Sequence, residues 1–257
     1  MSFGDDTLDT SNIPLPIKHP LIGVLDHGFV RLVNSMGSDI DIVRSARVSY
    51  NADWRSEPET SDRVSSTFQS KDEKLISYLL RNKHTSPFES VVFTFEIKCP
   101  IFVARQWHRH RTWAYNEVSA RYTELPNEVY LPTYDKITTQ NKDNKQMRTE
   151  EQNPHAHIIL KSITNNSVES FKRYLELLGL GCPRELARMV LPLNTYTRFF
   201  ATVNLHNLLH FLRLRLHSHA QYEIRVYAEA ILSIIEQIVP VTYKHFLVDL
   251  DNLGILV

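Results

Sequence analysis

The sequence is poor in glycine, and this scarcity excludes the common nucleotide-binding loops. Only seven glycines occur among 257 residues. They cannot form the G-x-G-x-x-G fingerprint of dinucleotide-binding folds or the G-x-x-x-x-G-K-[ST] phosphate loop. A nucleotide bound by this chain must therefore be held by side chains or by isolated main-chain amides.

Cysteine, surplus charge and long apolar runs are also lacking. The two cysteines, Cys99 and Cys182, lie too far apart in sequence for a C-x-x-C motif. The 29 Lys and Arg residues balance 29 Asp and Glu residues, which disfavours a general nucleic-acid binder. No apolar run reaches the roughly 18 residues of a membrane span, and the polar, acidic N-terminus does not resemble a signal peptide. We therefore expect a soluble, cytoplasmic protein without a nucleic-acid or membrane partner.

The residue patterns predict an α+β fold rather than a parallel α/β fold, because strands and helices do not alternate regularly. Residues 1–18 are predicted to be a flexible tail and 19–257 a single domain. Strands are predicted at 21–37 (a short strand or hairpin), 91–98, 128–132 and 194–204. Helices are predicted at 39–50, 71–83 (capped by Ser70), 101–111, 156–180, from Pro183 onward, and over 206–239 in two pieces. Polar insertions that we expect to be exposed are 51–70 and 136–154.

The densest set of reactive and charged side chains lies between residues 104 and 125. On a helix, Arg105 and Arg109 would share one face, with Gln106 and His110 on the adjacent one. Extended backbone from 117 to 121 would point a carboxylate, a hydroxyl and a guanidinium to one side: Glu117, Ser119 and Arg121. This combination suits a phosphorylated sugar. The residues alone leave open a solvated basic helix end with ordinary surface charges.

Two further features, a pair of arginines and a pair of histidines, each have a structural and a functional interpretation. Arg188 and Arg215 stand among aliphatic residues, where a guanidinium is costly to bury unless it meets an anion. An internal salt bridge or a side chain that reaches solvent would also explain them. The i,i+4 pair His206 and His210 could bind zinc, but no Asp, Glu or Cys stands at a matching spacing, so no metal is expected.

The stretch Arg109-His110-Arg111, followed after seven residues by Ser119, resembles the R-H-R-x7-S signature of the flavin-dependent thymidylate synthases. The similarity covers about residues 21–250. Further segments resemble that family in the same order: HTSPFE (84–89), PIFVARQW (100–107), YNEVSARY (115–122), PRELARMVLPLNTYTRFF (183–200) and LRLRLHSHAQYEI (212–224).

The resemblance implies a single catalytic domain with a central antiparallel sheet packed by helices. It implies a methyltransferase of dTMP biosynthesis that methylates dUMP at uracil C5. Methylenetetrahydrofolate would donate the carbon, and NADPH would reduce a bound FAD that supplies the hydride. The family forms homotetramers whose sites are shared between chains. Without the resemblance, a non-catalytic nucleotide- or RNA-binding protein remains the alternative, and such a protein would be colourless rather than yellow.

The resemblance also assigns site residues by position. Arg215 would be catalytic, since its guanidinium would stabilise negative charge on the pyrimidine, and His84 would lie near flavin and folate. The dUMP set is Gln106, Trp107, His108, Arg109, Glu117, Val118, Ser119, Ala120, Arg121, Arg188 and Arg215, with main-chain amides from 117 to 121 facing the phosphate. The FAD set is Ser86, Arg109, His110, Arg111, Glu117, Asn204, Leu205, His206 and His210. The chain departs from common family residues at Ser86 (often Thr), Ala120 (often Gly), His206 (Arg in some members) and His210 (Asn in some members).

Overall fold

The computed structural model describes residues 21–49, 70–145 and 147–255. The predicted tail at 1–18 and nearly all of the predicted insertion at 51–70 lie outside these ranges. None of the helices within them combines the length and the apolar character that crossing a bilayer demands.

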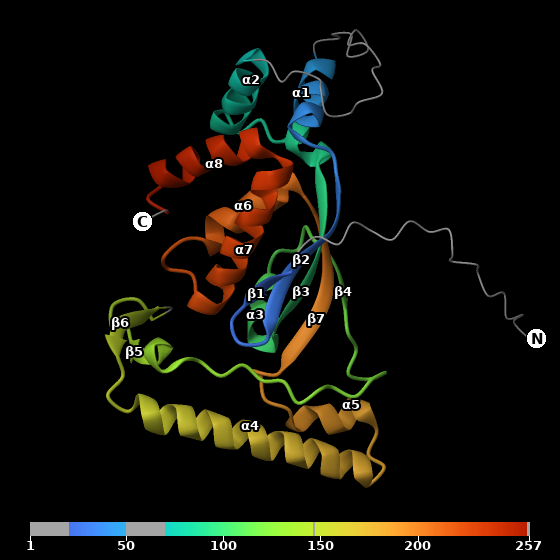
Figure 1. The fold of residues 1–257 in the computed structure, drawn as a ribbon, viewed down its shortest axis with the longest axis vertical. Helices are drawn as coiled ribbons and strands as arrows, with labels where there is room; N and C mark the ends of the chain where they lie inside the picture. The colour runs from blue at the N-terminus through green and yellow to red at the C-terminus, as the bar shows by residue number, and fades with distance from the viewer. Residues whose placement is uncertain (1–20, 50–69, 146, 256–257) are drawn as a thin grey trace, which may run out of the picture.

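A five-stranded antiparallel sheet forms the centre of the molecule, as the sequence predicted (Figure 1). The predicted hairpin at 21–37 is confirmed by the first two strands, which pair Ile22 with Val30. The strands, in sheet order, are β1 (Ile22–Val24), β2 (Gly28–Met36), β3 (Val92–Pro100), β7 (Tyr196–Asn204) and β4 (Ala114–Glu117). Every neighbouring pair is antiparallel, so the α+β prediction is confirmed.

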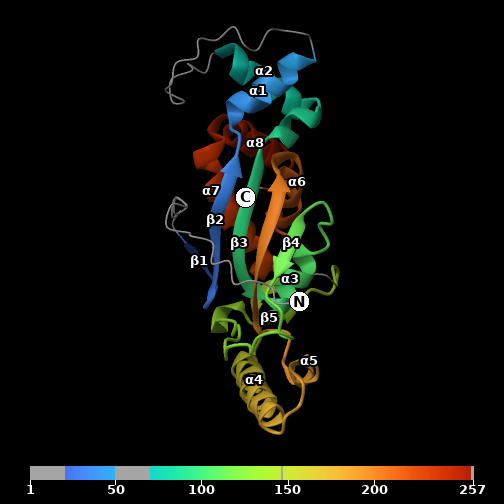
Figure 2. The same ribbon diagram turned by 90° about the vertical axis from the view of Figure 1, so that its right-hand side faces the viewer.

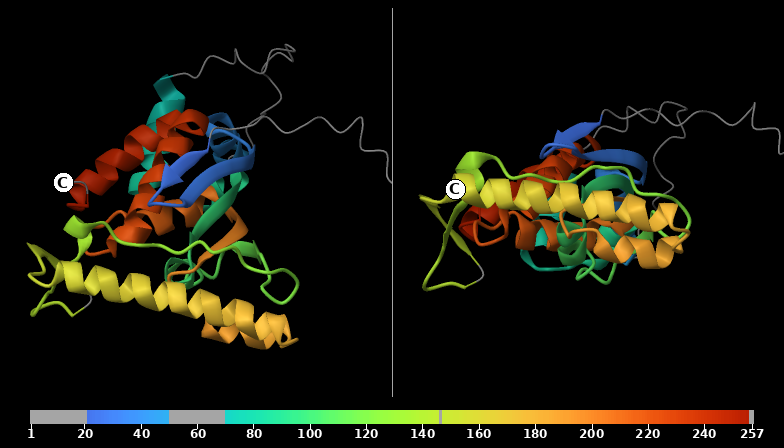
Figure 3. Two further views of the ribbon diagram at one scale, coloured as in Figure 1. Left: turned by 60° about the horizontal axis from the view of Figure 1, so that its bottom comes forward. Right: turned by 90° about the horizontal axis from the view of Figure 1, so that it is seen from below.

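Helices cover one face of this sheet. Figure 2 looks onto the opposite face, which carries no helix among the described residues. The longest helix, α4, runs across the lower end of the molecule together with α5 (Figure 3). The α-helices are α1 (Asp39–Val48), α2 (Ser70–Arg81), α3 (Ile101–Trp107), α4 (Ala156–Gly179), α5 (Arg184–Ala187), α6 (Leu205–Arg215), α7 (Tyr222–Ile238) and α8 (Pro240–Asn252). Short 3-10 turns are η1 (Ser86–Ser90), η2 (Tyr134–Lys136) and η3 (Arg188–Val190).

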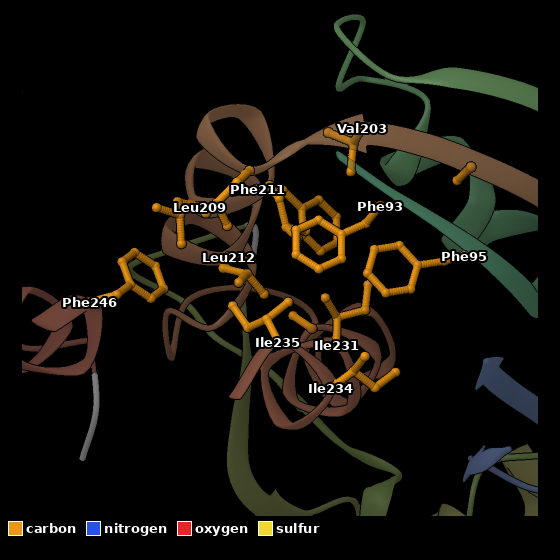
Figure 4. Close-up of a cluster of buried hydrophobic side chains, with 14 of the residues drawn as sticks. Phe93, Phe95, Val203, Leu209, Phe211, Leu212, Ile231, Ile234, Ile235 and Phe246 are labelled. Atoms are coloured by element: carbon orange, nitrogen blue, oxygen red, sulfur yellow. The ribbon is translucent and has the colours of Figure 1, made fainter. Parts of the chain in front are cut away.

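The core lies between the sheet and helices α6 and α7 (Figure 4). Phe93 and Phe95 are fully buried, because alternate residues of a strand point to the same face. Ile231 and Ile235 are buried on α7 one helical turn apart, as the 3.6-residue period requires. These two periodicities made the elements recognisable in the sequence.

Four predicted elements differ from the structure. The strand at 128–132 is reduced to a single bridge between Val129 and Thr195. The helix at 71–83 begins at Ser70, the residue predicted to cap it, and ends at Arg81. The helix at 101–111 ends at Trp107, because the Tyr115 hydroxyl donates to the main-chain oxygens of Trp107 (3.1 Å) and His110 (3.0 Å). The chain turns there instead of continuing the helix.

The insertion at 136–154 is the fourth difference. It forms a hairpin of β5 (Thr138–Gln140) and β6 (Arg148–Gln152) rather than merely an exposed polar segment. Arg148 anchors this hairpin by an ion pair of 3.0 Å to Glu223 at the start of α7.

Helix α8 was not predicted, because the residue patterns assigned no element beyond residue 239.

Candidate active site

A pocket of about 380 Å³ opens beside the end of β4. Four consecutive residues of the predicted dUMP set line it, from Glu117 to Ala120, and Arg188 faces them from the other wall. The remaining wall is largely apolar: Ile101, Leu125, Leu191, Pro192 and Leu193, with Thr197 beside them. The structure therefore joins residues that are about 70 positions apart in sequence into one concave surface.

The backbone does not stay extended over 117–121, so that prediction is wrong beyond Glu117. Strand β4 ends at Glu117, and the Ser119 carbonyl accepts hydrogen bonds from the amides of Tyr122 (3.0 Å) and Thr123 (3.2 Å). This turn directs Arg121 toward Glu185, with which it forms an exposed ion pair at 3.5 Å. Ser119 lines the pocket, while the charge of Arg121 is already paired.

The turn restricts which amides can reach a phosphate. The Val118 amide donates to the carbonyl of Arg198 at 2.9 Å, and the Arg121 amide donates to the Ser119 hydroxyl at 3.3 Å. The amides of Ser119 and Ala120 donate to no group among the described residues. These two amides, with the hydroxyl of Ser119, are the neutral hydrogen-bonding groups that this end of the pocket can offer an anion.

Thr197 is a pocket residue that the sequence did not reveal. Its hydroxyl donates to Glu117 Oε1 across the β4–β7 pair. The bond orients the carboxylate at the rim of the pocket. Only the strand pairing brings the two side chains together, so no local sequence signal pointed to Thr197.

A second group of predicted residues surrounds Arg215 at the end of α6. Its Nε donates to His110 Nε2 at 3.0 Å, and its Nη2 donates to the main-chain oxygen of Gln106 at 3.2 Å. Burial lowers the pKa of His110 to about 4, and the charges of Arg215 and His210 add to the shift. His110 is therefore neutral at pH 7 and accepts this bond through an unprotonated nitrogen.

The remaining members of the predicted FAD set lie near the start of α6. Asn204 caps this helix, since its side-chain oxygen accepts from the Asn207 amide at 3.0 Å. His206 follows in the first turn, and burial lowers its pKa. The rings of His210 and His110 are 6.3 Å apart, which joins this region to the Arg215 group. Ser86 and His84 are exposed at η1 and just before it.

Two predicted ligand residues have buried side chains. Trp107 and Leu205 are fully buried, so their side chains belong to the core, and a ligand could be contacted only by their main chain. The Trp107 ring stacks on Phe211 with centroids 4.9 Å apart. His108 is half-buried against Tyr115 and Phe199. These positions can reach a ligand only through their neighbours or main chain.

Several of the predicted site arginines have no counterion. Within residues 21–49, 70–145 and 147–255, no carboxylate lies within ion-pairing distance of four of them: Arg109, Arg111, Arg188 and Arg215. The internal salt bridge considered for Arg188 and Arg215 is therefore not observed. Burial lowers the pKa of Arg215, yet a guanidinium keeps its charge in proteins. These guanidiniums are free to pair with an anionic ligand.

The pair His206 and His210 does not extend to a metal centre. In the part of the chain that the structure describes, no three His, Cys, Asp or Glu side chains gather around a point that could hold an ion.

Comparisons with known proteins agree with this geometry. The family profile described as "Thymidylate synthase complementing protein" matches residues 31–241. A flavin-dependent thymidylate synthase from Treponema denticola is 48% identical over 225 residues, 87% of this chain and 80% of that protein. The one from Thermotoga neapolitana is 46% identical over 226 residues, 88% of this chain and 94% of that protein. The crystal structure of the UMP/dUMP methylase PolB from Streptomyces cacaoi, bound with 5-Br UMP, superposes with a TM-score of 0.75 at 35% identity and covers 88% of this chain and 96% of that one.

Proposed function

Because the chain belongs to the thymidylate synthase complementing protein family, we propose that it is a flavin-dependent thymidylate synthase. It methylates dUMP to dTMP, taking the carbon from methylenetetrahydrofolate and the reducing equivalents from NADPH. The enzyme works in the cytoplasm, as a single catalytic domain over residues 19–257.

The observation that carries this proposal is the pocket beside β4, which brings Arg188 together with Glu117 and Ser119. Arg188 lines the same pocket as Ser119 and Ala120, whose amides donate to no other group among the described residues, and this combination of donors suits a phosphate. Glu117 is held at the rim by Thr197, where its carboxylate can accept a hydrogen bond from a ribose hydroxyl.

Arg215 supplies the charge for the chemical step. It is half-buried and donates to two neutral acceptors, so it has no anion of its own. Uracil C5 becomes a nucleophile when negative charge is delocalised over the pyrimidine ring and its carbonyl oxygens, and the bond to the one-carbon unit then consumes that charge. A preorganised guanidinium in a poorly hydrated site stabilises that charge without having to reorient.

The second region fits FAD by the chemistry of its donors. Arg109 and Arg111 are exposed, form no ion pair with any residue that the structure describes, and flank the neutral His110, which suits a diphosphate beside an uncharged ring system. Asn204, His206 and His210 would add hydrogen bonds from α6. FAD, when bound, accepts a hydride from NADPH and delivers it to the nucleotide.

The site is completed by assembly into a homotetramer. Within one chain, Arg188 and the predicted dUMP residues from Glu117 to Ala120 line the pocket, whereas Gln106 and Arg215, which are hydrogen-bonded to each other, do not. On β7, Phe199 and Ala201 are buried, so Phe200 between them points to the opposite face of the sheet, where it is 44% exposed. Association through such faces joins the pocket of one subunit to the Arg215 group of another.

The absorption spectrum of the purified protein tests this function. We expect the bands of an oxidised flavin, bleached by NADPH under anaerobic conditions. A colourless protein that gains no flavin when FAD is added would favour the non-catalytic nucleotide- or RNA-binding alternative.

A further inference from the structure

Four side chains from distant parts of the sequence are hydrogen-bonded in series, from the β5–β6 hairpin to the candidate active site. Arg148 Nη2 of β6 donates to Glu223 Oε1 at 3.0 Å. Gln221 Nε2 donates to the other oxygen, Glu223 Oε2, at 2.8 Å. Gln106 Nε2 then donates to Gln221 Oε1. The last member of this series belongs to the predicted dUMP set.

Glu223 is the centre of the series and is built to remain a buried anion. It is 2% exposed and lies in the first turn of α7, where the helix dipole favours negative charge. Besides Arg148 and Gln221, the Tyr130 hydroxyl donates to it at 3.1 Å. Both carboxylate oxygens thus have donors, which a buried carboxylate requires.

The charge of Glu223 sets the direction of the series. An ionised carboxylate only accepts hydrogen bonds, so Gln221 must turn its NH2 group toward Glu223 and its oxygen away. That oxygen can pair only with a donor, so Gln106 must turn its own NH2 group toward Gln221. The side-chain oxygen of Gln106 then receives no hydrogen bond from the described residues and can accept one from a ligand.

Hydrogen bonds therefore hold both the main chain and the side chain of Gln106. Its main-chain oxygen accepts from Arg215 at 3.2 Å, while its side chain is held by Gln221. Arg215 and Gln106 are both half-buried members of the predicted dUMP set, from α6 and α3. The series thus links the orientation of the Gln106 side-chain amide to the β5–β6 hairpin.

We propose that Glu223 is a positioning residue for dUMP, which makes Gln106 present a hydrogen-bond acceptor to a donor group of the nucleotide. Arg148 anchors the hairpin and holds the Glu223 carboxylate, so the insertion at 136–154 supports substrate binding. This proposal rests on the proposed function, because it takes Gln106 as a dUMP ligand.

The test compares dUMP binding by equilibrium dialysis, together with KM and kcat for methylation, across matched variants. Glu223→Gln keeps the shape of the side chain but can also donate, so the direction of the series is lost. Gln221→Ala breaks the series and leaves the Arg148–Glu223 pair intact. We expect each to raise the dissociation constant and KM for dUMP about tenfold, with kcat and FAD content near the wild-type values.

Two hairpin variants separate positioning from folding. Arg148→Ala should weaken dUMP binding and Arg148→Lys should restore part of it, because a lysine can still donate to Glu223. Lys142→Ala, at the exposed turn of the same hairpin, should bind dUMP like the wild type. Melting temperatures measured in parallel test whether Gln221→Ala remains folded.

Normal dUMP affinity in a folded Gln221→Ala protein would overturn the positioning role, even if Arg148→Ala lowered stability. If Gln106→Ala also bound dUMP normally and still methylated it, Gln106 would not be a dUMP ligand. This inference would then be wrong, and the proposed function would stand. A wild-type protein that binds no dUMP would instead overturn the proposed function, and the inference with it.

Discussion

At the scale of single residues, Arg215 has the largest predicted effect on the chemical step. It is half-buried, charged and bonded only to neutral acceptors among the described residues. We expect Arg215→Ala to lower the rate of dTMP formation roughly 100-fold or more, as losing one preorganised electrostatic group does. Single-turnover assays at saturating dUMP measure this rate, and flavin absorbance shows whether FAD is retained.

The matched control for this variant is Arg173→Ala on α4, because Arg173 forms an exposed ion pair with Glu169 away from the site. It should turn over like the wild type. Near-normal turnover by Arg215→Ala would refute the role assigned to the guanidinium.

Ser119 ends the R-H-R-x7-S signature but lacks the surroundings of a nucleophile. A serine needs a positioned base, and His110 is already bonded to Arg215. The Ser119 hydroxyl lines the pocket, where it can donate to a phosphate oxygen. We expect Ser119→Ala to weaken dUMP binding by about 1–3 kcal/mol, the range for a hydrogen bond to a charged group.

The measurement is an assay of Ser119→Ala at saturating dUMP, where some dTMP formation should persist. Mass spectrometry of the wild-type protein during turnover is the second readout. A covalent adduct mapped to Ser119, or complete inactivity with intact dUMP binding, would make serine the nucleophile.

At the scale of elements, the contact between the turn after α3 and the end of α6 depends on pH. His110 is 8% exposed, and its pKa falls from 6.5 to about 4 on folding. The unfolded chain therefore binds this proton more readily, so the stabilisation is complete above pH 6.5 and is lost as the pH falls toward 4. By pH 4.5 the loss reaches about 2 kcal/mol.

Urea unfolding of the wild type and His110→Gln at pH 7 and pH 4.5 isolates this contribution. Glutamine keeps an acceptor for Arg215 but does not titrate in this range. The wild type should lose about 2 kcal/mol more than the variant between the two pH values. Equal losses would show that His110 is readily protonated in the folded protein.

Elements with one strong periodicity were predictable, and elements defined by pairing were not. β3, β7 and α4 follow apolar patterns of period 2 or 3.6 and lie close to where the sequence placed them. Strand β4 was missed, because its four residues show no alternation and are held by pairing with β7. The β5–β6 hairpin is polar, and its order depends on Glu223, which lies 75 positions from Arg148.

The candidate site shows the same division. The signature and the arginines predicted an anion-binding site, and three of the predicted residues, Glu117, Ser119 and Arg188, share one pocket. The side chains of Trp107 and Leu205 are buried, and adjacency in sequence to a site residue does not tell which way a side chain points. Thr197 and Gln221 act through contacts that only the folded chain creates.

At the scale of the whole molecule, FAD binding and subunit assembly should be linked. If the flavin site is shared between chains, FAD binds the assembled form better and stabilises it by mass action. We expect dilution to release FAD as tetramers dissociate, and added FAD to shift the assembly to lower protein concentration. Analytical ultracentrifugation with flavin detection measures both, and a monomer that binds FAD normally would contradict the shared site.

The central claim is that this pocket binds dUMP for flavin-dependent methylation. The most direct measurement is the product formed from dUMP and methylenetetrahydrofolate with NADPH, followed by mass spectrometry, with FAD or NADPH omitted in turn. The proposed function predicts dTMP only in the complete mixture and its near absence with Arg215→Ala. A folded, FAD-loaded protein that oxidises NADPH and binds dUMP but leaves it unmethylated would contradict the claim.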